Sequence, residues 1–291
     1  MTTYTVASLH RYPVKSMAGE ECDSVPVTDR GLLGDRAWAL VDAASRKIGS
    51  AKNVKKLGEL LQCRARFTSP PESIASSRSD GSASDTGAPA VRITLPDGTV
   101  IDSGHPDSES ALNTAFGPGV SLVSVAPDGL RLEFAAGTLG GKYADLTEIA
   151  VAGSAPSGTL FDYAAVHIIT TSTLRALEKE YPEGRFAVQR FRPNIVIDCG
   201  DATGFVENDW TGGTLTIGSD VTLKVSIPTP RCVMTTLPQA DLPADPRILK
   251  TATALNRRDL GDLGHLPCVG VYADIVRTGS LRRGDPVVIS H

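Results

Sequence analysis

Short runs of β-branched and other apolar residues, separated by turn-forming residues, recur along the whole chain. Typical runs are Val91–Leu95, Val120–Val125, Asn194–Asp198 and Val221–Ile227, in a chain that carries 28 glycines and 19 prolines. Strands of this length, closed by turn residues, are typical of barrels and sandwiches rather than of doubly wound sheets. The sequence therefore predicts a mainly β protein with some α-helix, of the α+β class.

Three segments have apolar residues at helical spacing. They are Asn53–Leu61, Ser172–Tyr181 and Arg247–Asn256. The second begins at a hydroxyl residue that can cap a helix, either Ser172 or Thr173. We expect these three segments to form the helices of the fold.

Residues 69–90 differ from the rest of the chain in being rich in Ser, Ala, Gly, Pro and Asp. Such a segment buries too little apolar surface to offset the entropy lost on ordering. Because strand-like sequence resumes directly after it, we interpret it as a flexible insert rather than a domain linker. Glycines cluster between residues 137 and 153, so we predict one domain over residues 1–135 and a second over 136–291.

The overall composition excludes several classes of partner. The chain has 291 residues, of which 29 are basic and 33 acidic, with a net charge of −4. Nucleic-acid binding usually leaves a basic footprint, so we expect no nucleic-acid partner. No run of apolar residues reaches the length of a transmembrane helix, and the N-terminal stretch lacks the apolar part of a signal peptide, so we expect no membrane partner.

The five cysteines are odd in number and form no C-x-x-C pair, which indicates free thiols and a cytoplasmic location.

Cys232 lies directly after a Pro-x-Pro bend that ends an apolar strand, and it follows Arg231. Proline ends the strand and places the next side chains at a sheet edge or cavity mouth. A neighbouring guanidinium favours the thiolate, the form that binds soft metals or attacks an electrophile. The alternative is a half-buried cysteine that packs as a small apolar residue.

Basic and hydroxyl side chains follow three early turns. Lys15 and Ser16 end the segment Tyr-Pro-Val-Lys-Ser, Arg36 leaves a glycine-bracketed turn, and Lys52 follows Gly-Ser-Ala. Phosphate groups are bound by such donors on short, rigid supports. The alternative is a set of surface charges paired with neighbours such as Asp35.

A second basic segment precedes the strand that ends at Asp198. If this segment is extended, Arg190, Arg192 and Asn194 share one face. Burial of two arginines requires an anion or a hydrogen-bonded ligand, because an unpaired buried charge is costly. A carboxylate of the chain, from Asp198 or Glu207, is the alternative partner.

Several common cofactor and catalytic motifs are absent from the sequence. It contains no G-x-G-x-x-G, H-E-x-x-H or G-x-S-x-G motif and no Walker loop. Cysteines at iron–sulfur spacing are also missing. We therefore expect no nicotinamide-binding half and no internal iron–sulfur cluster.

Taken in order, five motifs of this chain resemble those of one known family. They are Tyr-Pro-Val-Lys-Ser at 12–16, Gly-Asp-Arg at 34–36, Phe-Arg-Pro-Asn-Ile-Val at 191–196, Pro-Arg-Cys at 230–232 and Gly-Ser-Leu-Arg-Arg-Gly-Asp-Pro at 279–286. The chain resembles the MOSC superfamily with its N-terminal β-barrel domain, and in particular the branch of the mitochondrial amidoxime-reducing component and its bacterial relatives. The resemblance spans nearly the whole chain except the insert at 69–90. It implies an N-terminal β-barrel-like domain packed on a MOSC β-barrel.

The resemblance also implies a cofactor, the molybdenum cofactor (molybdopterin), and a role for each matching residue. Cys232 would be the metal ligand, with Arg231 beside it. Asp162 matches a position on the substrate side, where we expect a catalytic role shared with Cys232. The residues that would hold the pterin and its phosphate are Lys15, Ser16, Arg36, Arg192 and Asn194.

The expected activity is a molybdenum-dependent reduction of small N-oxygenated compounds, such as amidoximes, hydroxylamines and N-hydroxylated bases. Electrons would come from a separate electron-transfer protein. Two other functions stay open: sulfur transfer through a persulfide on Cys232, and a carrier that holds the cofactor without turnover. The set of basic residues favours a pterin over a bare persulfide.

Overall fold

A closed barrel forms the larger part of the computed structural model, which describes residues 4–45, 47–52, 57–71, 88–124, 131–135, 146–150 and 159–291. Its strands are β1 (Tyr4–Arg11), β13 (Val166–Thr170), β14 (Ile195–Asp198), β15 (Thr214–Ile217), β16 (Val221–Pro230), β18 (His265–Arg277) and β20 (Pro286–Ser290). These seven strands follow the order β13-β14-β1-β20-β15-β16-β18, and antiparallel pairing of β18 with β13 closes the barrel. β2 (Glu20–Cys22) pairs with β1, and β17 (Arg257–Asp259) pairs with β18.

Side chains buried in a common core hold the barrel together, as β15 illustrates. In β15, Leu215 and Ile217 are buried while Thr214 and Thr216 are half-buried, as expected for a strand with one face on a core. Each such aliphatic side chain contributes about 1.5–3 kcal/mol through burial. The barrel core also draws Val6 and Leu9 from the start of the chain.

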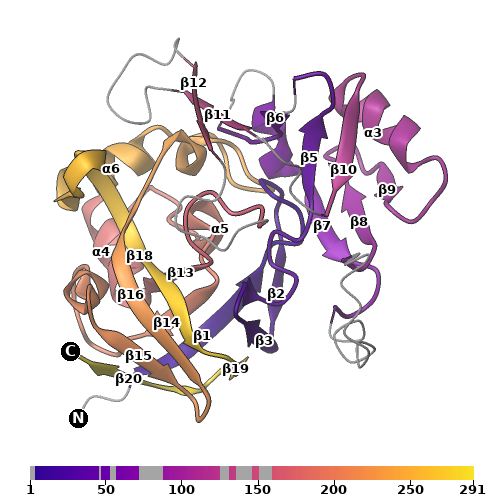
Figure 1. Cartoon of the computed structure of the whole chain (residues 1–291). Coiled ribbons are helices and arrows are strands. Elements are labelled where there is room, and N and C mark those ends of the chain that lie inside the picture. The colour runs from indigo at the N-terminus through magenta and orange to yellow at the C-terminus, as the bar shows by residue number, and fades with distance from the viewer. Residues whose placement is uncertain are drawn as a thin grey trace.

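The first strand belongs to the barrel although the other strands that complete it come from the C-terminal half. β1 lies between β14 and β20 and pairs antiparallel with both, and Figure 1 shows it crossing into the orange and yellow barrel. After β1, the chain leaves the barrel and enters the N-terminal sheets. Residues 12–17 therefore lie where the two parts of the molecule meet.

The N-terminal part contains smaller sheets, seen at the upper right of Figure 1. One has the order β10-β5-β6-β11-β12, formed by β5 (Ala39–Asp42), β6 (Lys47–Ile48), β10 (Val120–Val123), β11 (Arg131–Ala135) and β12 (Leu146–Ala150). A second consists of β7 (Arg64–Phe67), β8 (Val91–Thr94) and β9 (Val100–Asp102). A further sheet of β3 (Ser24–Thr28), β4 (Gly31–Leu32) and β19 (Gly279–Arg282) lies beside the barrel, low in Figure 1, and its Val25, Val27 and Leu281 belong to the barrel core. The core of the N-terminal part includes Met17, Leu60 and Ile93, and Met234 from the C-terminal half packs into it.

The helices agree in part with the sequence prediction. The described α-helices are α3 (Ser108–Phe116), α4 (Thr171–Glu180), α5 (Val188–Phe191) and α6 (Arg247–Leu255), and the 3-10 helices are η1 (Gly58–Gln62), η3 (Val206–Trp210), η4 (Val233–Thr236) and η5 (Gly261–Leu263). The prediction is confirmed for α4 and α6. The cap of α4 is Thr170, whose hydroxyl accepts from the Thr173 backbone N–H at 3.2 Å, and not Ser172 or Thr173.

The other helix predictions differ from the structure. In the segment 53–61, residues 58–61 lie in η1, while 53–56 are outside the described residues. Sequence reasoning missed α3, because Leu112 is the one buried residue of this helix and its apolar spacing is weak. It also missed α5, which is only one turn long.

The predicted α+β class, mainly β with a β-barrel, is confirmed. Most of the insert predicted at 69–90 is outside the described residues, as is the chain directly after residue 135. The division into 1–135 and 136–291 therefore stays a prediction.

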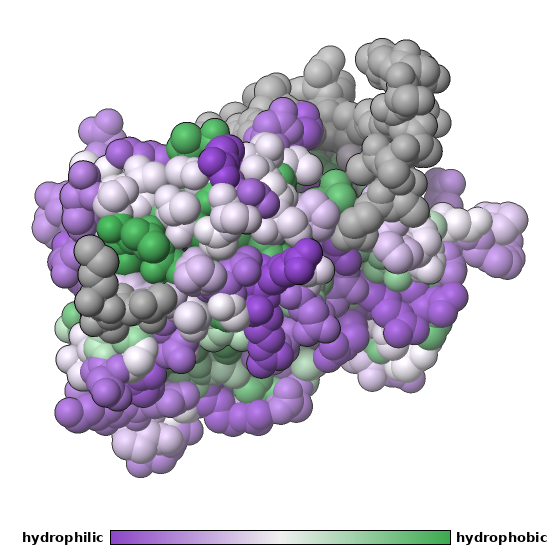
Figure 2. All heavy atoms as spheres, turned by 90° about the horizontal axis from the view of Figure 1, so that it is seen from below, coloured by the Kyte–Doolittle hydropathy of each residue, from purple (hydrophilic) through white to green (hydrophobic). Residues whose placement is uncertain are grey.

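The described surface is mixed in polarity. The face shown in Figure 2 is largely polar, with apolar side chains in separate patches. Exposed large apolar residues, such as Val100, Val276 and Val288, come from different strands. In the described part of the chain, no helix has the length and apolarity needed to cross a membrane.

Candidate functional site

A cavity of about 280 Å³ lies between the barrel and the N-terminal sheets. All eight residues predicted for the site line this cavity, and they are Lys15, Ser16, Arg36, Asp162, Arg192, Asn194, Arg231 and Cys232. They reach it from five places: the chain after β1, the connection from β4 to β5, the segment before β13, the connection from α5 to β14, and the end of β16. The structure therefore brings together residues that are up to 217 positions apart, from Lys15 to Cys232, while their individual roles stay predictions.

Two lysines share one carboxylate in the cavity. Lys15 Nζ contacts Asp162 Oδ1 and donates to the Leu160 carbonyl at 2.7 Å. Lys52 Nζ lies 2.9 Å from Asp162 Oδ2. Burial alone would raise the pKa of Asp162, but the two lysines outweigh burial and hold this pKa well below its usual range. Asp162 is therefore ionised at neutral pH and holds both ammonium groups in place.

The two lysines differ in their electrostatics. Burial lowers the pKa of Lys15, and the charge of Asp162 offsets only part of this effect. For Lys52, burial would also lower the pKa, but the charges of Asp162 and Cys232 outweigh it and raise the pKa. Lys52 is thus held as an ammonium by the carboxylate of Asp162, with which it is in contact.

Strained backbone conformations concentrate at the cavity. Among the described residues, four that are not glycine have positive φ, and three of them line the cavity: Ser16 (64°), Arg36 (47°) and Arg192 (54°). The fourth is Ala240. Such conformations cost about 1–3 kcal/mol each and persist where the surrounding structure enforces them, often at functional sites. This strain is an independent sign that the cavity is functional.

Arg36 and Arg192 lie against the same aromatic ring. Their guanidinium carbons are 4.7 Å and 4.2 Å from the centroid of Tyr12. Arg192 also donates to the Met17 carbonyl at 2.6 Å. Burial and the nearby charge of Arg36 lower the pKa of Arg192 to about 10. Two cations held this close on rigid supports favour an anionic ligand.

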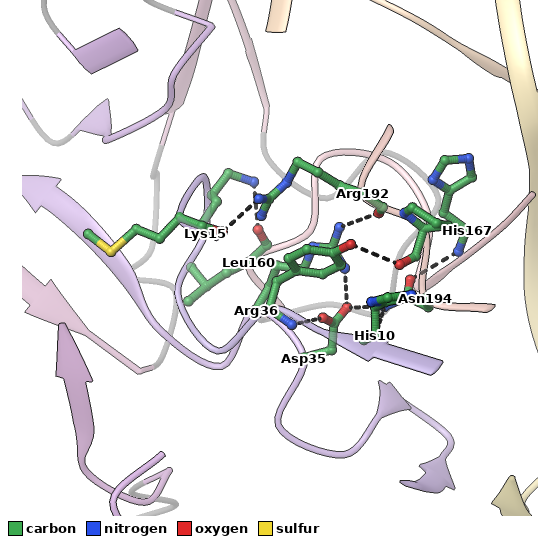
Figure 3. Close-up of polar contacts among 11 residues, drawn as sticks. His10, Lys15, Asp35, Arg36, Leu160, His167, Arg192 and Asn194 are labelled. Atoms are coloured by element: carbon green, nitrogen blue, oxygen red, sulfur yellow. Dashed lines mark hydrogen bonds and ion pairs between the residues drawn. The ribbon is translucent and has the colours of Figure 1, made fainter. Parts of the chain in front are cut away.

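Asp35 connects this pair to the barrel. Its carboxylate contacts Arg36, accepts from Asn194 Nδ2 at 2.9 Å and accepts from the Tyr12 backbone N–H at 2.8 Å. Asn194 Oδ1 in turn accepts from the backbone N–H of His167 at 3.1 Å, and Figure 3 shows this network. Asn194 lines the cavity, and its side chain therefore holds both Asp35 and β13 in place.

Cys232 is half-buried at the end of β16, directly before the 3-10 helix η4. Its carbonyl accepts from the Thr235 backbone N–H at 3.2 Å and from the Thr235 hydroxyl at 3.0 Å. The neighbouring Arg231 donates through Nη2 to the Phe191 carbonyl at 2.9 Å, while its buried Nε has no hydrogen-bond partner among the described residues. An unsatisfied buried donor is costly unless a ligand completes it.

Arg190 has a different role from the one predicted. The segment is not extended: α5 ends at Phe191, and Arg192 turns the chain in a left-handed conformation, so Arg190 and Arg192 do not share a face. Arg190 is fully buried and donates to backbone carbonyls only, those of Arg185, Thr235, Leu237 and Pro243. It thereby fixes the loop that follows Cys232.

The proposed carboxylate partners of this segment bind other groups. Glu207 is buried and accepts from the hydroxyls of Thr170 and Thr173 at 2.6–2.7 Å. Asp198 accepts from the Thr171 hydroxyl at 3.1 Å. Both carboxylates support the start of α4.

The eight predicted site residues leave out several others that line the cavity, notably Lys52, Tyr163, His167 and Tyr272. Lys52 had a local signal, because it follows the same kind of glycine-containing turn as Arg36. The aromatic residues had none. His167 faces Tyr272 only because β13 pairs with β18.

We expect the free energy of unfolding to decrease as the pH is lowered from 6.5, because of His167. Burial, aided by the charge of Arg231, lowers the pKa of this imidazole well below 6.5. Since the folded-state pKa is depressed, the stabilising contribution is present above the unfolded-state pKa and is lost as the pH falls below it. The loss is up to about 1.4 kcal/mol per pH unit. Urea unfolding from pH 5 to 7.5 should show a shallower dependence in His167→Gln, and equal dependence in both proteins would refute the assignment.

Comparison with known proteins agrees with this architecture. The family model of the MOSC domain matches residues 155–288, and that of the MOSC N-terminal beta barrel domain matches residues 3–83. Mitochondrial amidoxime reducing component 2 of Homo sapiens is 35% identical over 132 residues, and the same protein of Macaca fascicularis is 34% identical. Each match covers 43% of this chain and 37% of the relative, so it spans well under half the length of these relatives.

A solved structure is also similar over almost the whole length. The YUAD protein from Bacillus subtilis covers 99% of this chain and 97% of its own, with 11% identity and a TM-score of 0.42. A score of this size adds nothing to the family assignment, which rests on the two family models and their order along the chain. The chain therefore belongs to the MOSC family and carries a MOSC N-terminal β-barrel domain followed by a MOSC domain.

Proposed function

We propose that this cavity holds the molybdenum cofactor, with Cys232 as the protein ligand to the metal, and that the loaded protein reduces small N-oxygenated compounds. MOSC domains are associated with molybdenum-cofactor binding. The observation that carries the proposal is that a half-buried thiol and a set of buried cations line one cavity. A soft metal prefers the thiolate, and a phosphate prefers the cations.

The residues of the cavity suit both ends of such a cofactor. Lys15, Ser16, Arg36 and Arg192 would hold the pterin and its phosphate on backbone positions that are fixed in advance. At the other end, Arg231 Nε is a buried donor without a partner among the described residues, and we propose that the cofactor completes it. Cys232 would supply one ligand, and the remaining metal ligands would come from the cofactor itself.

The reaction requires two electrons and two protons. The N–O bond of the substrate breaks, the nitrogen takes up one proton, and the hydroxyl group takes up the other and leaves as water. When bound, the cofactor would supply the two-electron redox chemistry. We propose that a separate reduced electron-transfer protein, with a flavin, haem or iron–sulfur centre, restores the electrons.

The residues of this chain would position the cofactor and the substrate. Asp162 is held as a carboxylate by Lys15 and Lys52, so we propose that it positions these lysines rather than donating a proton. Lys15 Nζ, which contacts Asp162 and the Leu160 carbonyl, would hold the phosphate, so the protons of the reaction would come from water. The relatives named for amidoxime reduction support the substrate class, although the match covers 37% of their length.

The decisive test is turnover by the protein purified from a host that makes molybdenum cofactor. We expect reduction of benzamidoxime to benzamidine with an artificial electron donor, at two electrons per product. Metal binding without turnover would favour a cofactor carrier. A protein without molybdenum that acquires a persulfide on Cys232 would favour sulfur transfer. The five cysteines, odd in number and without a C-x-x-C pair, support our proposal of a cytoplasmic location, because reducing compartments keep thiols from pairing.

A further inference from the structure

A pair of stacked tyrosines forms one wall of the cavity. The rings of Tyr163 and Tyr272 have centroids 5.5 Å apart and an interplanar angle of 25°. The edge of His167 packs on Tyr272 with a centroid distance of 5.7 Å. Each ring of this set lines the cavity. The three rings support one another, which fixes the orientation of the two tyrosines.

The apolar residues of the cavity complement this aromatic pair. Met234, Leu263 and Leu266 line the same cavity. Leu263 is 40% exposed, so this residue lies where the cavity meets solvent. A phosphate gains nothing from such side chains. A ligand with a flat apolar surface does, because it removes that surface and theirs from water.

The cationic residues of the cavity already contact other groups of the protein. Lys15 and Lys52 are tied to Asp162, and Arg36 and Arg192 lie against Tyr12. These contacts hold the cationic groups together. The cavity thus contains one set of side chains suited to an anionic group and another suited to a ring.

We propose that Tyr163 and Tyr272 form a stacking platform that selects substrates with a planar aromatic ring next to the N-oxygenated group. This inference rests on the proposed reductase function and specifies its substrate class. Aromatic rings prefer offset-stacked or edge-to-face contacts with other rings. Tyr163 is the specificity residue to test, because it is partly exposed and is not packed in a core cluster, so its truncation should not prevent folding.

The experiment compares benzamidoxime with acetamidoxime, which carries a methyl group in place of the ring. In the molybdenum-loaded protein, Tyr163→Ala should lower the ratio of kcat/KM for benzamidoxime to that for acetamidoxime by about tenfold, mainly through KM. Tyr163→Phe, the matched control, should retain the ratio, because it keeps the ring and loses only the hydroxyl. An unchanged ratio in Tyr163→Ala, or an equal loss in Tyr163→Phe, would overturn the platform.

A binding measurement separates this inference from the reductase function. Saturation-transfer NMR on the metal-free protein should show stronger binding of benzamidoxime than of acetamidoxime, and Tyr163→Ala should remove the difference. If the loaded protein reduces neither compound but this preference is seen, the reductase proposal fails and the platform stands. If both compounds are reduced without any ring preference, the platform fails and the reductase stands.

Discussion

Replacement of Cys232 by alanine is expected to remove molybdenum from the purified protein. Cys232 is the one cysteine that lines the cavity, and in the described part of the chain no three His, Cys, Asp or Glu side chains gather as an alternative metal site. Loss of groups that only support a metal ligand already costs about 10–100-fold in affinity or activity. Loss of the ligand itself should therefore reduce the molybdenum content at least about tenfold and abolish reduction of benzamidoxime.

Metal analysis of wild type and Cys232→Ala, purified side by side, measures this effect. Cys22→Ala is the matched control, because Cys22 is also a half-buried cysteine but belongs to β2 and does not line the cavity. The control should keep its molybdenum. Full retention of metal in Cys232→Ala, with an unchanged melting temperature, would rule out Cys232 as the ligand.

Replacement of Arg190 by methionine is expected to destabilise the fold by about 3–5 kcal/mol. Arg190 is fully buried, and its guanidinium donates to four backbone carbonyls. Methionine fills a similar volume but leaves these carbonyls without a donor. For a protein of this size, a change of this magnitude lowers the melting temperature by about 10 °C.

Thermal and urea unfolding measure the change, with Arg277→Ala as the control. Arg277 also donates to two backbone carbonyls, those of Asp220 and Ser219, but its side chain is 58% exposed. Water can replace these bonds, so the control should lose less than about 1 kcal/mol. Equal losses in the two variants would show that burial of Arg190 adds nothing.

The Arg190 variant should also affect the metal site. Two of its acceptors, the carbonyls of Thr235 and Leu237, belong to the segment that directly follows Cys232. Release of this segment is expected to loosen the thiol at the cavity. Folded Arg190→Met protein should therefore retain less molybdenum than wild type.

Local patterns in the sequence were sufficient for the fold class and pointed to several residues that line the cavity. Short β-branched runs between glycines and prolines predicted a barrel or a sandwich, since strand length and turn chemistry are properties of neighbouring residues. The predicted cavity residues Lys15 and Arg36 each follow a local turn signal, whereas the sequence predicts an extended segment at Arg192. The structure places all three residues on one cavity. Ser16 and Arg36 hold strained backbone conformations there, which fits the turns from which they are predicted. The left-handed conformation of Arg192 instead replaces the extended segment expected at this position.

Only the tertiary structure decided which distant residues meet. β1 joins the barrel by pairing with β14 and β20, which lie far from it in the chain. No local pattern encodes such a pairing. The same is true of the contact between Lys52 and Asp162 and of the stack of Tyr163 on Tyr272. Arg190 looked like a site residue because charge at a strand entrance suggests a ligand, but the turn at Arg192 directs it to backbone carbonyls. Sequence thus determined which residue types occur and which short elements they form, whereas strand register and long-range packing determined which of them share the cavity, because these depend on contacts between segments that are far apart in the chain.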